Sequence, residues 1–212
     1  MVIPEFEPWL KYPALTVDRL SLIATLIRTV RKDCVDLYEP QNGDGPWSLG
    51  CRVYERTFFA IKEFAKDEAV ATWLSINREF RPLQFSFSIG PVPLRFYRGD
   101  PDDPPSHVLA RSDGELLHMQ YCIHFDDRPA VDTVLRLAVE VDSERQAVAV
   151  FLIEIDEYKE VIGQYRIPLE SANFNIRTFQ TPPINIAPVK AEPIKTDTAA
   201  NQREAKSNAG SK

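Results

Sequence analysis

The first third of the chain has the hydrophobic spacing of amphipathic helices. Apolar residues recur every three or four positions from Leu20 to Leu37, and Thr16 stands where a helix N-cap is expected. This pattern predicts a helix with one apolar face on a core and with charged residues, Arg31 among them, largely off that face. A second helical pattern covers 49–64, after a turn-rich segment at 39–48. Asp67 can cap a third helix, which we expect to contain Val70, Trp73, Leu74 and Phe80.

The period of the pattern changes to two at Pro82. Large apolar residues then alternate with Gln84, Ser86 and Ser88, which predicts a strand with one face in the core and one in water. Gly90-Pro91 predicts a turn into a second strand at 94–98. Three later alternating segments, 135–141, 149–155 and 161–167, are joined by short acidic connections and predict an antiparallel meander.

The segment 112–125 fits both a helix and a strand. Ser112 and Glu115 have the spacing of a capping box, and the apolar residues after them can form a helix face. The same segment also alternates strictly from Leu117 to Phe125 and contains aromatic residues, which favours a strand. The capping box favours a helix for the first part, and the rest stays open between the two.

These elements together predict an α+β fold. N-terminal amphipathic helices are expected to pack on one face of a twisted antiparallel sheet that ends in the meander. Residues 1–180 are predicted to form a single compact domain. Residues 181–212 contain four prolines and no aromatic residue, so they have little surface to bury and are predicted to form a disordered tail.

Truncation of the chain after Gln180 tests the tail prediction. The thermal unfolding midpoint is expected to stay nearly unchanged, because the removed segment has little apolar surface to bury. Differential scanning calorimetry of the full and truncated chains measures this difference. A fall of more than a few degrees would show that the tail packs on the domain.

Charge and cysteine content narrow the class of protein. The 212 residues carry a net charge of −6, and residues 1–180 carry −8 because five of the 25 basic and three of the 31 acidic residues lie after position 180. An acidic body repels a phosphate backbone, so nucleic acid is not an expected partner. Three cysteines form no disulfide framework, and neither a signal peptide nor a membrane span is recognisable. We expect a cytoplasmic protein in a reducing compartment.

Metal and catalytic patterns are weak. His118, Cys122 and His124 are the one cluster of soft ligands, but they supply no complete ligand set, so we expect neither a metal site nor a cofactor. The aspartates of the segment 99–106 do not match a calcium loop and predict a rigid surface loop. Glu157-Tyr158-Lys159 resembles a nuclease Glu-x-Lys element, yet it falls at the tip of a predicted hairpin, where its side chains point to water. No nucleophile elbow, phosphate-binding glycine loop or dinucleotide fingerprint occurs.

The segment 93–99 mixes apolar and basic residues and is the candidate binding site. In a strand, Arg95 and Tyr97 share one face and Phe96 lies on the other. We therefore predict that Phe96 packs in the core, whereas Arg95, Tyr97 and Arg98 form a partner or anion contact outside it. Arginine and tyrosine are common at binding hot spots. The competing interpretation is an edge strand protected by its charges. Trp47 joins the candidate site because core packing does not explain a tryptophan in a glycine-rich loop.

The sequence favours a non-enzymatic binding or accessory protein of a bacterial type, which acts through interaction with another protein. One alternative is a small-ligand or enzyme domain, in which helices and a curved cone-like sheet enclose a pocket. The other is an antitoxin or immunity protein, whose acidic body would cover a basic toxin surface.

Overall fold

The helices and strands follow each other in the order expected for an α+β chain. The computed structural model describes residues 6–78, 85–112, 115–116 and 133–169, all within one compact unit of the chain. Its helices are α1 (Pro8–Lys11), α2 (Val17–Asp36), the 3-10 turn η1 (Pro40–Asn42), α3 (Pro46–Phe64), α4 (Glu68–Ala71) and α5 (Ser106–Leu109). Its strands are β1 (Leu74–Arg78), β2 (Phe85–Ile89), β3 (Val92–Arg98), β4 (Val134–Val141), β5 (Ala147–Ile155) and β6 (Val161–Arg166). The predicted tail, 181–212, lies outside the described residues.

The predicted first helix is confirmed as α2. Thr16 caps it, because the Thr16 hydroxyl oxygen accepts a hydrogen bond from the Arg19 backbone N–H at 3.4 Å. Leu20, Ile23 and Ile27 are buried along its apolar face. The sequence placed Arg31 off this apolar face, and that prediction is wrong. Arg31 is buried, with only 3% of its surface exposed.

The second and third predicted helices begin or end elsewhere than expected. α3 begins at Pro46, so Trp47 belongs to a helix and not to the loop before it. Asp67 caps α4 as expected, accepting from the Ala69 N–H at 2.9 Å, but α4 ends at Ala71. The chain then enters β1 at Leu74, where the expected helix would have continued. The ladder to β2 decides this, because it pairs Leu74 with Ile89 and Ile76 with Phe87.

The six strands form one sheet in the order β1-β2-β3-β4-β5-β6. All neighbours are antiparallel except β3 and β4, which run parallel. β2 and β3 form the predicted hairpin, whose turn places Gly90 at φ 58°, a left-handed conformation that favours glycine. The predicted meander is confirmed in β4, β5 and β6.

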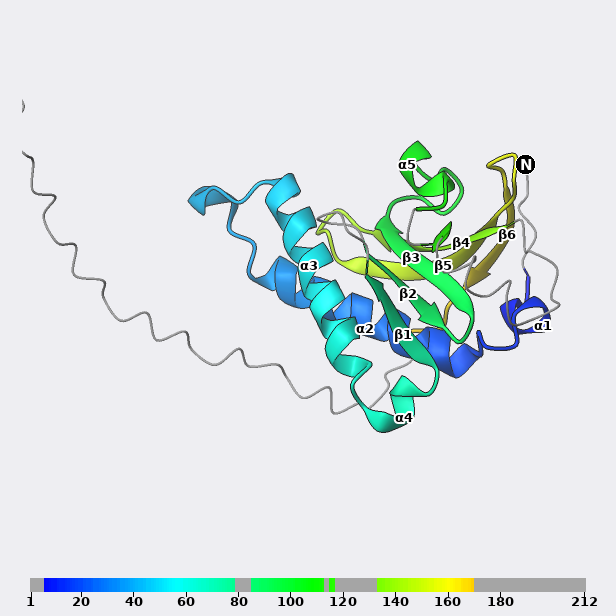
Figure 1. Ribbon diagram of the computed structural model, residues 1–212. Helices are drawn as coiled ribbons and strands as arrows, with labels where there is room; N and C mark the ends of the chain where they lie inside the picture. Colours follow the sequence, from blue (N-terminus) through cyan, green and yellow to red (C-terminus); the bar gives the residue numbers. More distant parts are fainter. Residues whose placement is uncertain (1–5, 79–84, 113–114, 117–132, 170–212) are drawn as a thin grey trace, which may run out of the picture. The chain divides into compact units, whose positions relative to one another are not determined.

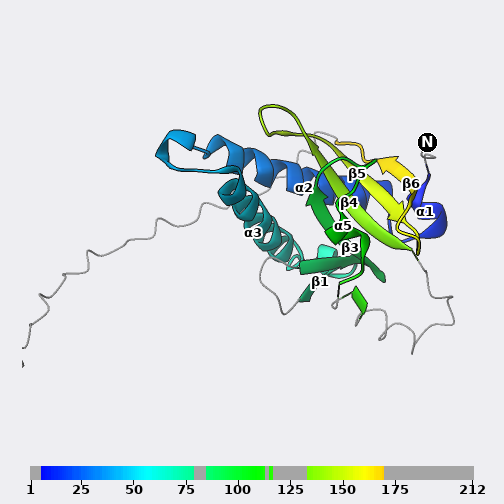
Figure 2. The same ribbon diagram turned by 90° about the horizontal axis from the view of Figure 1, so that it is seen from above.

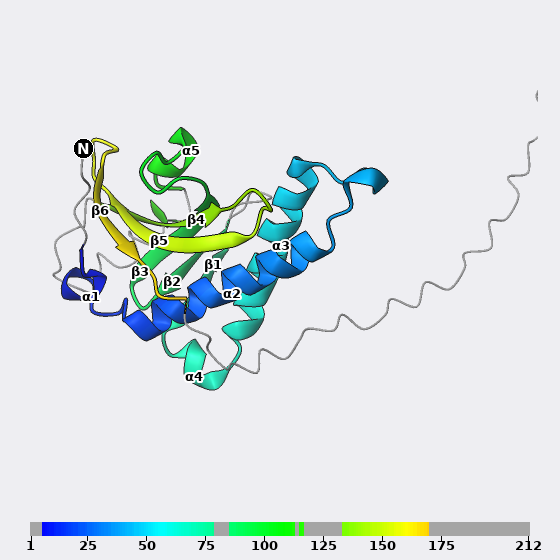
Figure 3. The ribbon, with the colours of Figure 1, turned by 180° about the vertical axis from the view of Figure 1, so that it is seen from behind.

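The helices α2 and α3 lie on one side of the sheet, and α5 lies against the other side of β4 (Figures 1 and 3). Seen from above, α2 runs beneath β4 and β5 while α3 passes β1 (Figure 2). The sequence predicted that the second face of the sheet lies in water, but described residues on this face are buried. Ser86 and Ser88 of β2 and Arg136 of β4 are each 0% exposed. No helix in the described part of the chain is both long and apolar enough to cross a bilayer.

Arg136 holds the connection between β3 and β4 onto this second face. Its guanidinium forms a buried ion pair with Glu115 and donates to the carbonyls of Val108 at 2.8 Å and Ala110 at 2.9 Å. The predicted capping box is confirmed at its two ends: Glu115 accepts from the Ser112 N–H at 2.8 Å, and Ser112 accepts from the Glu115 N–H at 3.3 Å. The remainder of the ambiguous segment, 117–125, lies outside the described residues.

Candidate functional site

The candidate site begins where strand β3 changes partners. Its first half pairs with β2 through Val92, Pro93 and Leu94. Its second half, Arg95 to Arg98, pairs with β4. The β2 ladder stops at Leu94, so this second half has a strand partner on one side only among the described strands. Side chains from both faces of β3 can therefore reach the space beside that edge.

Tyr54 of α3 occupies the point where β2 leaves β3. Its hydroxyl oxygen accepts a hydrogen bond from the Phe85 backbone N–H at 2.9 Å. Its ring stacks on Phe96, with ring centroids 5.2 Å apart and planes inclined by 25°. The ring centroids of Phe96 and Phe85 are 5.7 Å apart. Tyr54 thus connects α3 to both β2 and β3 at this edge.

A cavity of about 420 Å³ opens beside this edge, and we call it the arginine pocket. Its basic lining residues come from α2, β3 and α5 and are Arg31, Arg95, Arg98 and His107. Its aromatic lining residues are Trp47, Tyr54, Phe96 and Tyr97. The other lining residues are small or apolar and are Ile27, Pro46, Gly50, Cys51, Val53, Val108 and Val139. None of these described lining residues carries a carboxylate.

The four residues singled out from the sequence all line this one cavity. Arg95, Tyr97 and Arg98 reach it from β3, and Trp47 reaches it from the first turn of α3. Trp47 is 79% exposed, which agrees with the expectation that core packing does not explain it. The sequence could not place Trp47 and β3 at the same cavity, because the two segments lie about 50 residues apart in the chain.

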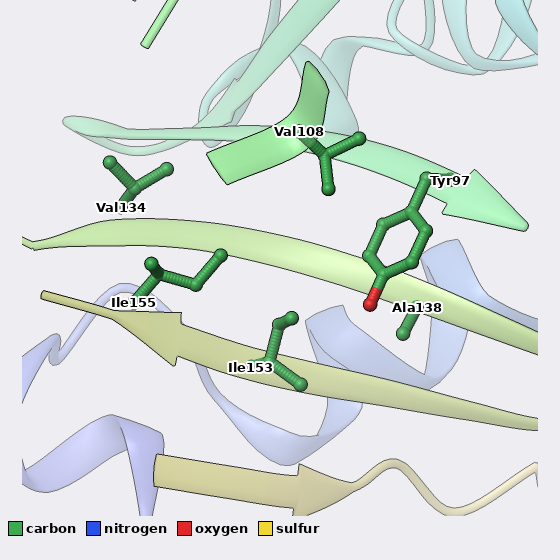
Figure 4. Close-up of a cluster of buried hydrophobic side chains, with 6 residues drawn as sticks. All are labelled: Tyr97, Val108, Val134, Ala138, Ile153 and Ile155. Carbon is green, nitrogen blue, oxygen red and sulfur yellow. The ribbon is translucent and has the colours of Figure 1, made fainter. Parts of the chain in front are cut away.

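Tyr97 and Phe96 differ from their predicted roles. Tyr97 is only 6% exposed, and its ring lies among Val108, Ala138 and Ile153 (Figure 4). Its hydroxyl donates to the Asp100 carbonyl at 3.0 Å, and burial is the main cause that raises the pKa of this phenol. Phe96 is half-buried and forms part of the pocket wall. The prediction that Tyr97 stays outside the core is therefore wrong, because α5 covers the sheet face on which it lies.

The main pocket residue that the sequence interpretation missed is Arg31. Its Nε donates to the Arg145 carbonyl at 2.7 Å, whereas its Nη2 is buried and has no hydrogen-bond partner among the described residues. The signal was present in the sequence. Arg31 stands four residues after Ile27 and three before Cys34, so it lies on the same helical face as these two buried residues.

The charges of the pocket are not neutralised by ion pairs within the described structure. Burial lowers the pKa of Arg31, and the nearby positive charge of Arg98 lowers it further. The negative charge of Asp142 acts in the opposite direction but lies outside the pocket lining. No ion pair to Arg31, Arg95 or Arg98 occurs in the described part of the chain, whereas Arg52 pairs with Asp44 at 2.9 Å.

The other sequence candidates do not join this site. His118, Cys122 and His124 lie outside the described residues. The Asp100 side chain accepts from the Asp102 N–H at 2.9 Å, so these aspartates belong to a tight loop. Glu157, Tyr158 and Lys159 are exposed between β5 and β6, at the hairpin tip where the sequence placed them. Within the described residues, no three His, Cys, Asp or Glu side chains gather as a metal site would require.

The arginine pocket can hold an anion against an aromatic surface. Guanidinium groups donate in pairs to carboxylate or phosphate oxygens, and aromatic walls bind flat apolar groups. Cys51 contributes a free thiol to the same wall. No protein-family model, curated protein or solved structure matches the chain. A proposal for its function therefore rests on the chemistry of the pocket.

Proposed function

We propose that this chain is a non-enzymatic binding protein that holds an anionic group of a partner protein in the arginine pocket. The observation that carries the proposal is the convergence of Arg31, Arg95 and Arg98 on one cavity, whose described lining residues include no carboxylate. Three guanidiniums held together repel one another, and an anionic ligand offsets that repulsion.

The surroundings of the pocket support selective binding. The body of the protein is acidic, so a cluster of positive charge within it attracts an anion locally while the rest of the surface repels it. Trp47 is exposed beside the pocket, and exposed tryptophan next to arginine is typical of binding hot spots. A partner that inserts an acidic side chain next to an apolar one matches both features.

A second candidate function is binding of a small anionic molecule. The cavity volume of about 420 Å³ supports it, because pockets for small ligands commonly measure roughly 300 to 1,000 Å³. The two candidates share the arginine pocket and differ in what carries the anion.

The double substitution Arg95→Ala, Arg98→Ala tests the proposed function. Both side chains are at least partly exposed, so the free energy of unfolding should change by less than about 1 kcal/mol. Capture of partners from host extract, identified by mass spectrometry, should fall strongly for the double variant. The loss should be clearest at low salt, where exposed charges are least screened.

The matched control is Arg28→Ala, Lys62→Ala. It removes the same number of positive charges, one from α2 and one from α3, but neither residue lines the arginine pocket. This variant should capture the same partners as the unaltered protein. Equal capture by the Arg95, Arg98 variant would place the interface elsewhere. Unfolding of that variant would assign the two arginines a structural role.

A further inference from the structure

The charge of the pocket selects among anions. Arg31, Arg95 and Arg98 line the arginine pocket without an ion pair in the described structure, so a ligand with one negative charge leaves most of the positive charge uncompensated. A phosphate monoester carries about two negative charges at neutral pH and offers three acceptor oxygens. It therefore matches several guanidiniums better than a carboxylate does.

Arg31 supplies the second, independent observation. Its side chain is 3% exposed, lines the pocket, and keeps Nη2 buried without an acceptor among the described residues. A buried donor without a partner is unfavourable, and an oxyanion in the pocket can satisfy it. The Nε of the same group is held by the Arg145 carbonyl at 2.7 Å, so the guanidinium is positioned in advance.

The aromatic residues of the pocket wall indicate which organic group a bound phosphate would carry. Tyr54 and Phe96 form a stacked pair in the pocket wall, and Trp47 adds an exposed indole. A short aliphatic phosphate ester has no ring to place against this wall. An aryl phosphate places its ring against them while its phosphate meets the arginines.

From these observations we infer that the arginine pocket binds an aryl phosphate, as presented by a phosphorylated tyrosine side chain of the partner protein. The inference rests on the proposed function and specifies the anion of that same site. A free aryl phosphate shares this chemistry, and the experiment below separates the two sources.

Isothermal titration calorimetry of the full chain at about pH 8, where a phosphate monoester is doubly charged, tests the inference. The probes are phenyl phosphate, phenyl sulfate, benzoate and inorganic phosphate. Phenyl phosphate should bind about tenfold or more tightly than the singly charged phenyl sulfate and benzoate, because its second negative charge strengthens its charge-assisted hydrogen bonds to the guanidiniums. It should also bind more tightly than inorganic phosphate, which lacks the ring.

Substitutions assign the effect to the pocket. Arg31→Lys keeps one positive charge but loses the paired donors, so the affinity for phenyl phosphate should fall by about tenfold. Arg98→Ala should cause a similar loss and, as an exposed change, keeps the test valid if Arg31→Lys fails to fold. The Arg28→Ala, Lys62→Ala control should bind phenyl phosphate as the unaltered chain does.

A short peptide that contains phosphotyrosine, compared with its unphosphorylated form, identifies the source. Tighter binding of the phosphopeptide than of phenyl phosphate supports a partner side chain, whereas binding of phenyl phosphate alone overturns that source in favour of a small molecule. Equal binding of benzoate and phenyl phosphate overturns the phosphate inference and leaves the proposed anion-binding function intact. No binding of any anion, together with undiminished partner capture by Arg95→Ala, Arg98→Ala, overturns both.

Discussion

Glu115→Ala is expected to lower the free energy of unfolding by about 3 to 5 kcal/mol, because it removes the buried carboxylate that pairs with the buried guanidinium of Arg136. Arg136 is 0% exposed and Glu115 is 2% exposed. The other acceptors of Arg136 among the described residues are backbone carbonyls, which carry no net charge to balance the guanidinium. Urea denaturation followed by circular dichroism measures the change.

Two variants set the scale for this loss. Glu115→Gln keeps a hydrogen-bond acceptor without the charge, so it should cost less than the alanine substitution. Lys66→Ala breaks the exposed Lys66–Glu63 pair, whose nitrogen and oxygen are 2.6 Å apart, and should cost under about 1 kcal/mol. If Glu115→Ala were no more harmful than Lys66→Ala, the ion pair would not hold the connection between β3 and β4 onto the sheet.

Tyr97→Ala is expected to cost about 3 to 5 kcal/mol of unfolding free energy, as other buried aromatic residues do when they are truncated. The ring packs in the cluster with Val108, Ala138 and Ile153, and removing it leaves a cavity between α5 and the sheet. Tyr97→Phe removes only the hydrogen bond to the Asp100 carbonyl and should cost about 1 kcal/mol. The same urea titration measures both variants.

Trp47→Ala is the matched control for Tyr97, because it removes a larger aromatic side chain from the same pocket lining. Trp47 is 79% exposed, so its loss should change stability by no more than about 0.5 kcal/mol. A Tyr97→Ala variant as stable as Trp47→Ala would contradict the assignment of Tyr97 to the core and return it to the binding surface.

Gly99 makes the packing around Tyr97 tight. A Cβ atom added at Gly99 would lie 3.0 Å from Cε2 of the Tyr97 ring, closer than side chains normally approach. The glycine that follows β3 therefore allows the loop to fold back over the ring. The sequence shows this glycine, but the sequence alone does not identify the ring against which it packs.

The sequence by itself determined the elements whose evidence is local. Thr16 and the spacing of Leu20, Ile23 and Ile27 define α2, and strict alternation with short connections defines the meander of β4, β5 and β6. Local steric and capping preferences act within a few residues, so they can be identified from the amino-acid sequence alone. The same holds for the N-cap of α4 at Asp67, whereas the length of α4 was decided by the pairing of β1 with β2.

Only the tertiary structure decided which residues are buried and which meet. Alternation places Tyr97 and Arg136 on one face of the sheet, but α5 and Glu115 turn that face into a second core. The divergence of β2 from β3 after Leu94 opens the arginine pocket, and α2 and α3 then bring Arg31 and Trp47 to it. These contacts join distant parts of the chain, and their energies depend on the packing of whole elements, which no local pattern of residues encodes.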